Sequence, residues 1–263
     1  MPYNSELKMT RTQLRLFRFL LLITAAAITS FAPPKQKKIL VFSKTAGYRH
    51  KDAIQAGKKE IPLLGSKNKF LVDTTENADA FTSENLKQYS AVVFLCTTGN
   101  VLNEQQQQAF EQFIKNGGGY VGLHSAADTE YDWPWFGELN GAYFKSHPKQ
   151  QEAVFNIVDD NNIATAHLPK PWKRFDELYN FKWIGTDIHV LITIDESSYT
   201  GGGNGEYHPM AWYHEFDGGR GFYTALGHDN KSFEDPLYLQ HILGGIKYVM
   251  GDSPEIKRTA STK

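Results

Sequence analysis

Short apolar runs alternate with amphipathic stretches through the first half of the chain. The apolar runs cover residues 38–42, 70–74, 91–96 and 120–123. Strands that are buried on both faces of a parallel sheet have this nearly continuous apolar character. We therefore predict that these four runs form neighbouring strands of one parallel sheet.

The stretches between these runs have helical spacing. The predicted helices cover residues 52–64, 83–86 and 104–116, the last of them capped by Asn103 and ended by the glycines at 117–119. Pro62 is expected to end or kink the first helix before Gly65. Strands that alternate with helices indicate βαβ units, so the fold class is α/β with an open, mostly parallel sheet.

The second half of the chain is richer in β-type patterns. Predicted strands cover residues 152–158, 190–195, 210–216 and 221–226, and residues 133–140 are helical or irregular. The turn at 217–220 contains Asp-Gly, which favours a tight hairpin between the last two strands. A helix over 236–250 closes the fold. We predict one domain, residues 36–251, with β insertions in its C-terminal half and a polar tail at 252–263.

The first 32 residues have the layout of a secretory signal peptide. A basic region with Lys8, Arg11, Arg15 and Arg18 precedes an apolar stretch over 19–27, and small residues follow as far as Ala32. The apolar stretch is short for a transmembrane helix. We expect cleavage of this segment, export to the periplasm or beyond, and no stable membrane insertion afterwards. An uncleaved anchor is the alternative.

Charge and cysteine content argue against nucleic-acid binding and against stabilisation by disulfides. The formal net charge is -1, which provides no basic field for binding nucleic acid. The only cysteine is Cys96, so no disulfide can form within the chain.

Polar side chains follow several of the predicted strands. Ligands bind outside the carboxyl ends of the strands in open parallel sheets. The residues in question are Arg49 and His50, Thr98, His124 with Ser125 and Asp128, and His228 with Asp229. We expect these residues to form one polar site at this edge of the sheet.

His124 occupies the centre of Gly122-Leu123-His124-Ser125-Ala126, which has the strand–turn–helix layout of a nucleophile elbow. An imidazole at this position can act as a general acid or base, or as a metal ligand. It does not form the acyl-enzyme of a serine or cysteine hydrolase. The sequence therefore argues against an amidotransferase or serine hydrolase mechanism.

Seven motifs resemble the ThuA-like (trehalose-utilisation) family, in order along residues 38–251. They are GYRH (47–50), GYVGLH (119–124), WPW (133–135), GAYF (141–144) with His147, DELY (176–179), PMAW (209–212) and GRGFYTALGHD (219–229). The resemblance implies a flavodoxin-like fold of the class I glutamine amidotransferase type without the amidotransferase cysteine. It also implies a small carbohydrate as partner, trehalose-like or 3-keto-glycosidic. Asn161-Asn162 departs from the His-Pro common in relatives.

Within this framework, the catalytic candidates are His124, His50, His228, Asp229 and Glu177. His124 would be the acid/base, and Asp229 or Glu177 would orient an imidazole. Alternatively, Asp229 caps a helix and Glu177 makes a structural hydrogen bond. The substrate-binding candidates are Arg49, Thr98, Asp128, Trp133, His147 and Trp212. The tryptophans could equally pack in the core.

A divalent metal ion is a further possibility, since imidazoles with a carboxylate suit zinc or a similar ion. No His-Glu-x-x-His motif exists, and His208 and His214 on one strand would lie roughly 20 Å apart. Three functions stay open. The first is a hydrolase, lyase or isomerase that uses His/carboxylate acid–base chemistry. The second is a non-catalytic carbohydrate-binding module, and the third is a metal-dependent hydrolase.

Overall fold

A computed structural model describes residues 36–252. The predicted signal peptide, and all but the first residue of the predicted tail, lie outside the described residues and stay predictions. The strands are β1 (Lys38–Phe42), β2 (Leu71–Thr75), β3 (Ala91–Leu95), β4 (Gly119–Leu123), β5 (Ala142–Ser146), β6 (Gln151–Ile157), β7 (Trp172–Asp176), β8 (Asn180–Ile184), β9 (His189–Ile194), β10 (Pro209–Phe216) and β11 (Gly219–Thr224). The helices are α2 (Lys51–Asn68), α3 (Ser83–Leu86), α4 (Glu104–Lys115), α5 (Pro134–Asn140), α6 (Asn230–Glu234) and α7 (Pro236–Val249), with 3₁₀ turns at Ala78–Ala80, His124–Asp128 and Glu196–Ser198.

The strands form one nine-stranded mixed sheet and a separate ribbon of β5 and β8. The order in the large sheet is β2-β1-β3-β4-β11-β10-β9-β6-β7. The strands from β2 to β11 are parallel to their neighbours, and those from β10 to β7 pair antiparallel. The α/β fold class is therefore confirmed, with the β-rich part in the C-terminal half. The strands β5, β7 and β8 were not predicted.

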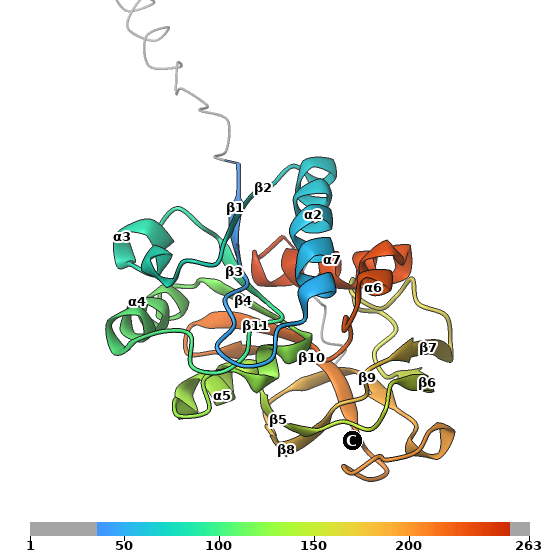
Figure 1. The fold of residues 1–263 in the computed structure, drawn as a ribbon. Helices are drawn as coiled ribbons and strands as arrows, with labels where there is room; N and C mark the ends of the chain where they lie inside the picture. Colours follow the sequence, from blue (N-terminus) through green and yellow to red (C-terminus); the bar gives the residue numbers. More distant parts are fainter. Residues whose placement is uncertain (1–35, 253–263) are drawn as a thin grey trace, which may run out of the picture. The chain divides into compact units, whose positions relative to one another are not determined.

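Helices cover both faces of the parallel part of the sheet, with α2, α6 and α7 on one side and α3, α4 and α5 on the other (Figure 1). Neighbouring residues of β3 show this division. Phe94 packs against Phe110 of α4 and Phe136 of α5, whereas Leu95 lies against Gly57 of α2. Because successive side chains of a strand point to opposite faces, the continuous apolar run of β3 fills two cores.

Helix α2 is longer than predicted, because Pro62 lies inside it and the helix continues to Asn68. It ends at Lys69, which has a left-handed φ of 64°. Gly65 is a close-packing position rather than a terminator, since a Cβ atom there would lie 2.7 Å from the Phe70 carbonyl oxygen. Burial of one helix face against the sheet outweighs the hydrogen bond that the proline removes.

The hairpin between β10 and β11 is confirmed, although its second strand begins two residues earlier than predicted and ends at Thr224. Phe216 pairs with Gly219, and the two turn residues Asp217 and Gly218 have φ of 47° and 91°. Two positive φ angles are what a type I′ turn requires. Ala225 and Leu226 therefore follow the strand and lead directly into the loop with His228. Within residues 36–252, no helix is long and apolar enough to cross a membrane.

Candidate functional site

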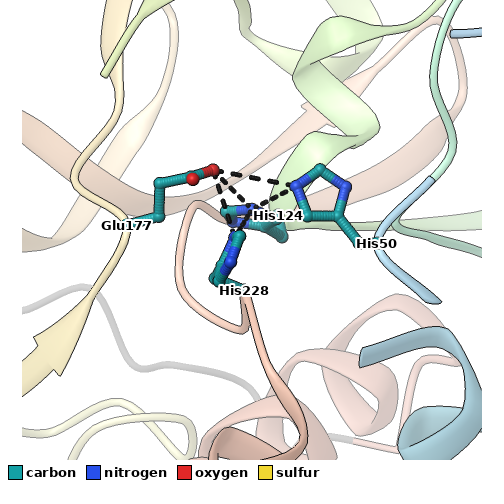
Figure 2. A group of neighbouring side chains, drawn as sticks. All are labelled: His50, His124, Glu177 and His228. Carbon is teal, nitrogen blue, oxygen red and sulfur yellow. Dashed lines mark hydrogen bonds and ion pairs between the residues drawn. The ribbon is translucent and has the colours of Figure 1, made fainter. Parts of the chain in front are cut away.

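Three histidines and a glutamate from four distant segments meet at the carboxyl edge of the sheet (Figure 2). His50 directly precedes α2, His124 follows β4, Glu177 follows β7, and His228 lies in the loop after β11. One donor atom from each residue lies within 4.8 Å of the others. The three histidines therefore lie together, as predicted. Among residues 36–252, they and Glu177 form the one group of three or more potential metal ligands.

The backbone at His124 has the conformation of a nucleophile elbow. Its φ is 53°, between the end of β4 and a 3₁₀ turn. Gly122 permits the close packing beneath this turn, since a Cβ atom there would lie 2.6 Å from Asn140 Oδ1. The elbow directs the buried ring of His124 into the cluster.

Hydrogen bonds outside the cluster fix two of the imidazoles. His124 Nδ1 lies 2.7 Å from the Ala225 carbonyl oxygen. A carbonyl oxygen only accepts, so Nδ1 carries the hydrogen and the neutral ring presents the Nε2 lone pair to the cluster. His50 Nδ1 lies 3.2 Å from Ser125 Oγ, which leaves its Nε2 facing inward. Such outer contacts are typical of imidazoles that bind metals.

Five of the six separations between the inward atoms are similar, and all six lie within 4.8 Å. His124 Nε2 is 3.3 Å from His50 Nε2 and 3.4 Å from His228 Nδ1. Glu177 Oε2 is 3.3 Å from His124, 3.2 Å from His228 and 3.7 Å from His50. Bonds of about 2.0–2.2 Å in a tetrahedral zinc site place neighbouring donors about 3.4 Å apart. Five separations of the four residues are close to this value, so the residues could hold a divalent metal ion.

The charges of the cluster favour an ionised glutamate. Burial by itself would raise the pKa of Glu177, but its close contacts with the imidazoles of His124, His228 and His50 outweigh burial and hold this pKa well below its usual range. Burial is the main cause that lowers the pKa of His50 to about 4. For His228, the hydrogen bond and charge of Glu177 overcome burial and raise the pKa. The site thus combines a carboxylate, a neutral imidazole and an imidazole that accepts a proton readily.

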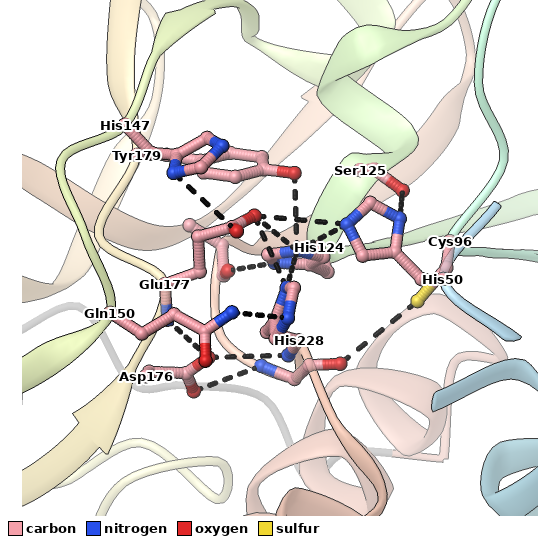
Figure 3. A network of polar contacts seen from close by, with 12 residues as sticks. His50, Cys96, His124, Ser125, His147, Gln150, Asp176, Glu177, Tyr179 and His228 are labelled. Carbon is pink, nitrogen blue, oxygen red and sulfur yellow. Dashed lines mark hydrogen bonds and ion pairs between the residues drawn. The ribbon is translucent and has the colours of Figure 1, made fainter. Parts of the chain in front are cut away.

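Further polar groups surround the cluster (Figure 3). Tyr179 Oη lies 3.1 Å from His124 Nε2, and His147 Nδ1 lies 3.4 Å from Glu177 Oε1. The Gln150 amide nitrogen lies 2.7 Å from His228 Nε2. Sequence reasoning gave Tyr179 and Gln150 no role. Tyr179 stands inside the DELY motif, which is a usable signal, whereas nothing in the sequence around Gln150 indicates a site.

A pocket of about 290 Å³ opens onto the cluster. Its lining residues are Tyr48, His50, Asp128, Phe144, His147, Gln150, Glu177, Tyr179 and His228. Asp128 accepts a hydrogen bond of 2.6 Å from Tyr131 Oη, and burial raises its pKa. Two predicted substrate-binding residues, Asp128 and His147, thus line the pocket together with three cluster residues.

Among the predicted site residues, the cluster residue His124 does not line this pocket, and neither do five residues outside the cluster. Asp229 accepts a hydrogen bond from the Ser232 amide as the N-cap of α6, which is the capping alternative. Arg49 pairs with Glu76, and Thr98 Oγ1 donates to the Tyr48 carbonyl.

The two tryptophans among these five pack within the protein. Trp133 stacks on Trp135 and Phe136, and its indole N–H donates to Glu111. Trp212 is fully buried and donates to the Asn140 carbonyl. Both indoles therefore pack in the core, which is the alternative to substrate binding.

The fold and the site define an α/β protein with a His₃Glu cluster at the carboxyl edge of its sheet. The profile of the ThuA family, described as trehalose utilisation, matches residues 38–249, and the chain belongs to this family. The predicted resemblance is thus confirmed, and membership indicates a carbohydrate-related role. No curated protein matches the chain.

Several solved structures share the fold. A ThuA-like protein from Bacteroides uniformis is 24% identical, with a TM-score of 0.69, over 81% of this chain and 91% of that one. A ThuA-like protein from Parabacteroides merdae is 21% identical, with a TM-score of 0.69, over 85% and 93%. A cytoplasmic protein from Salmonella typhimurium is 12% identical, with a TM-score of 0.59, over 81% and 99%. At these identities the likeness shows the fold alone.

Proposed function

We propose that this protein is a metal-assisted enzyme that processes a small carbohydrate in the pocket beside the His₃Glu cluster. One observation carries the proposal: four donor atoms from four segments lie 3.2–3.7 Å apart along the measured edges, as the ligands of a tetrahedral ion would. The family's carbohydrate-related role supports a sugar as substrate. Zinc is an ion that imidazole and carboxylate ligands suit, and it is the ion used in the tests below.

The ion would supply Lewis-acid polarisation of a sugar oxygen. His50, His124 and His228 would hold it, and Glu177 would either complete the shell or leave one position for substrate. Asp128 lines the same pocket, and burial raises its pKa, so it can take up or return a proton of the bound sugar. Tyr48 is 70% exposed at this pocket and offers a ring face for stacking on a sugar.

These groups suit a hydrolase, lyase or isomerase reaction on a trehalose-like or 3-keto-glycosidic sugar. A carbonyl on the substrate would make the neighbouring C–H acidic once its oxygen is polarised, and Asp128 is the carboxylate available to remove that proton. The substrate class comes from the family resemblance, and the proton transfer comes from the pocket.

The test combines metal content with turnover. The purified chain is analysed for bound metal and assayed on 3-keto-disaccharides and their parent sugars, before and after chelation and after zinc is restored. We expect stoichiometric metal, turnover that chelation removes and zinc restores, and loss of both metal and turnover in His50→Ala. His189→Ala is the matched control, because His189 is an exposed histidine on β9.

Two other results would select the alternatives. Turnover that is independent of metal would favour His/carboxylate acid–base catalysis, for which the ionised Glu177 beside His228 is the supporting observation. Saturable sugar binding without any turnover would favour a carbohydrate-binding module. Either result would contradict the metal-assisted enzyme.

We also propose that the protein acts outside the cytoplasm, on the basis of the basic and apolar pattern of residues 8–32. Cell fractionation, with the N-terminus of the mature protein determined by mass spectrometry, tests this location. An intact N-terminus in the cytoplasmic fraction would contradict it.

A further inference from the structure

Asp176 is a buried carboxylate whose side chain is 1% exposed and which receives four donors. Oδ1 accepts from the amide of Glu177 at 2.9 Å and from the amide of His228 at 3.2 Å. Oδ2 accepts from the amide of Gly227 at 3.1 Å and from Arg174 Nε at 3.0 Å. The two oxygens of an ionised carboxylate offer about four acceptor sites, so these donors use its whole capacity.

Three of those donors belong to the two segments that carry Glu177 and His228 (Figure 3). Glu177 follows β7 at one end of the sheet order, whereas His228 follows β11 in its middle, and no ladder pairs these strands. Asp176 therefore connects the backbones of two cluster residues that the sheet itself does not hold in register. Their side chains meet at 3.2 Å, between His228 Nδ1 and Glu177 Oε2.

Arg174 fixes Asp176 from the other side. Its Nη1 donates to Asp235 at 2.9 Å and its Nη2 donates to Ser232 Oγ at 2.7 Å. The guanidinium also lies over the rings of Trp172 and Tyr238, at 4.9 Å and 5.1 Å. A planar group that makes three hydrogen bonds and contacts two aromatic rings has little freedom to turn, so it fixes the position of the carboxylate.

Gly227 shows how tightly this loop is defined. Its φ is 111°, and a Cβ atom there would lie 2.2 Å from Tyr238 Oη. The loop therefore follows one path between the carboxylate and the tyrosine, and His228 leaves that path toward the cluster.

We propose that Asp176, held by Arg174, is a positioning residue that sets the separation of Glu177 from His228 and thereby the affinity and coordination geometry of the metal site. This inference rests on the proposed function, because it concerns the ion that the cluster would bind. An asparagine at 176 could accept through one atom only, and its NH₂ group would face backbone N–H donors. Loss of the outer partners of metal ligands typically weakens metal binding by 10–100-fold.

The experiment compares Asp176→Asn with the wild-type chain and with Asp195→Asn. Asp195 also accepts a backbone amide, that of Ser197, but at a 3₁₀ turn that is not part of the cluster. Zinc affinity is measured by competition with a chelator, and coordination geometry by the visible absorption of the Co²⁺-loaded proteins. Circular dichroism establishes that each variant is folded.

We expect Asp176→Asn to bind zinc about 10–100-fold more weakly and to change the Co²⁺ spectrum, with both quantities unchanged in Asp195→Asn. A folded Asp176→Asn with wild-type affinity and spectrum overturns the inference and leaves the proposed function intact. Wild-type protein that binds neither ion overturns the proposed function, and the inference falls with it.

Should Asp176→Asn fail to fold, Arg174→Lys replaces it, since lysine keeps the charge and loses the planar fork. A changed Co²⁺ spectrum in this variant supports the inference, and an unchanged spectrum with unchanged zinc affinity overturns it.

Discussion

At His124, the left-handed backbone conformation and the position of the side chain in the cluster depend on each other. A φ of 53° is uncommon for residues other than glycine, although asparagine, aspartate and histidine adopt it more often than the rest. The Ala225 carbonyl then fixes the ring by accepting from Nδ1. Substitutions at this position consequently change the backbone and the ligand set together, unless the new residue tolerates the left-handed region.

His124→Asn separates the two effects, because asparagine adopts this conformation more readily than most residues. We expect the variant to fold and to lose zinc affinity by more than the 10–100-fold that an outer partner contributes, since a ligand itself is removed. Chelator competition measures the affinity, and His189→Asn is the matched control. Near-normal affinity in His124→Asn would exclude His124 from the ligand set.

At this scale the sequence was informative about histidines and uninformative about aromatic residues. His50, His124 and His228 lie in segments that follow parallel strands, and ligand sites form at this edge of an open sheet. Trp133 and Trp212 have no comparable signal, because an indole with its N–H satisfied packs equally well in a core or against a ligand. Gln150 contacts His228 only because folding brings a loop that is distant in sequence next to the cluster, so the sequence gives no signal for this contact.

Helix α2 shows how packing decides the length of an element. Pro62 lacks the amide that would complete its turn, and Gly65 lies where a side chain would strike Phe70 and Val72. Both residues usually end helices, and here the buried face carries the helix past them.

Two substitutions in α2 should have opposite effects on stability. Pro62→Ala restores a helical donor, and we expect it to raise the free energy of unfolding by about 1–2 kcal/mol, after allowing for the more flexible unfolded chain. Gly65→Ala would place its Cβ 2.7 Å from the Phe70 carbonyl oxygen, and we expect a loss of about 1–3 kcal/mol. Urea denaturation measures both. Equal signs for the two variants would contradict this view of the helix.

The unpredicted strand β7 has a physical explanation in its own burial pattern. Trp172, Arg174 and Asp176 point inward, and Lys173 and Phe175 are exposed. Two of the three inward residues are charged, so the alternation of apolar and polar positions that identifies a strand is absent. The charged residues that position the site therefore remove the pattern by which β7 could be predicted. In contrast, β1, β3 and β4 have continuous apolar runs and were predictable.

Over the whole molecule, buried histidines make stability depend on pH. Burial lowers the pKa of His241 to about 3, and it also lowers the pKa values of His208 and His214. In the unfolded chain these rings titrate near 6.5. Below that pH the unfolded state binds more protons than the folded state, so stability falls as pH falls.

His241→Asn isolates one of these rings. Asparagine can keep a donor toward the Ala164 carbonyl, which His241 Nδ1 contacts at 2.8 Å. We expect a lower free energy of unfolding at pH 7 but a shallower decline between pH 6 and 4, by about 1.4 kcal/mol per pH unit. Urea denaturation across this range gives the slope. An unchanged slope would mean that His241 is already protonated when folded.

The proposed ion should also stabilise the fold as a whole, because its ligands come from four separate segments. A ligand present at 100 times its dissociation constant adds about 2.7 kcal/mol to the free energy of unfolding. We expect the melting temperature of metal-free protein to rise as zinc is added, and to stay constant for His228→Ala. A similar rise in His228→Ala would place zinc binding elsewhere.

The order of the ligands along the chain has a consequence for biosynthesis. His50, His124 and Glu177 emerge from the ribosome long before His228, so the ligand set is complete only when most of the chain has been made. A protein that crosses a membrane unfolded would then select its ion from the metals available on the far side, and one that folds where it is made would select from the cytosol. Since metal choice depends on availability as well as affinity, the ion found in native protein would record the compartment in which the chain folded.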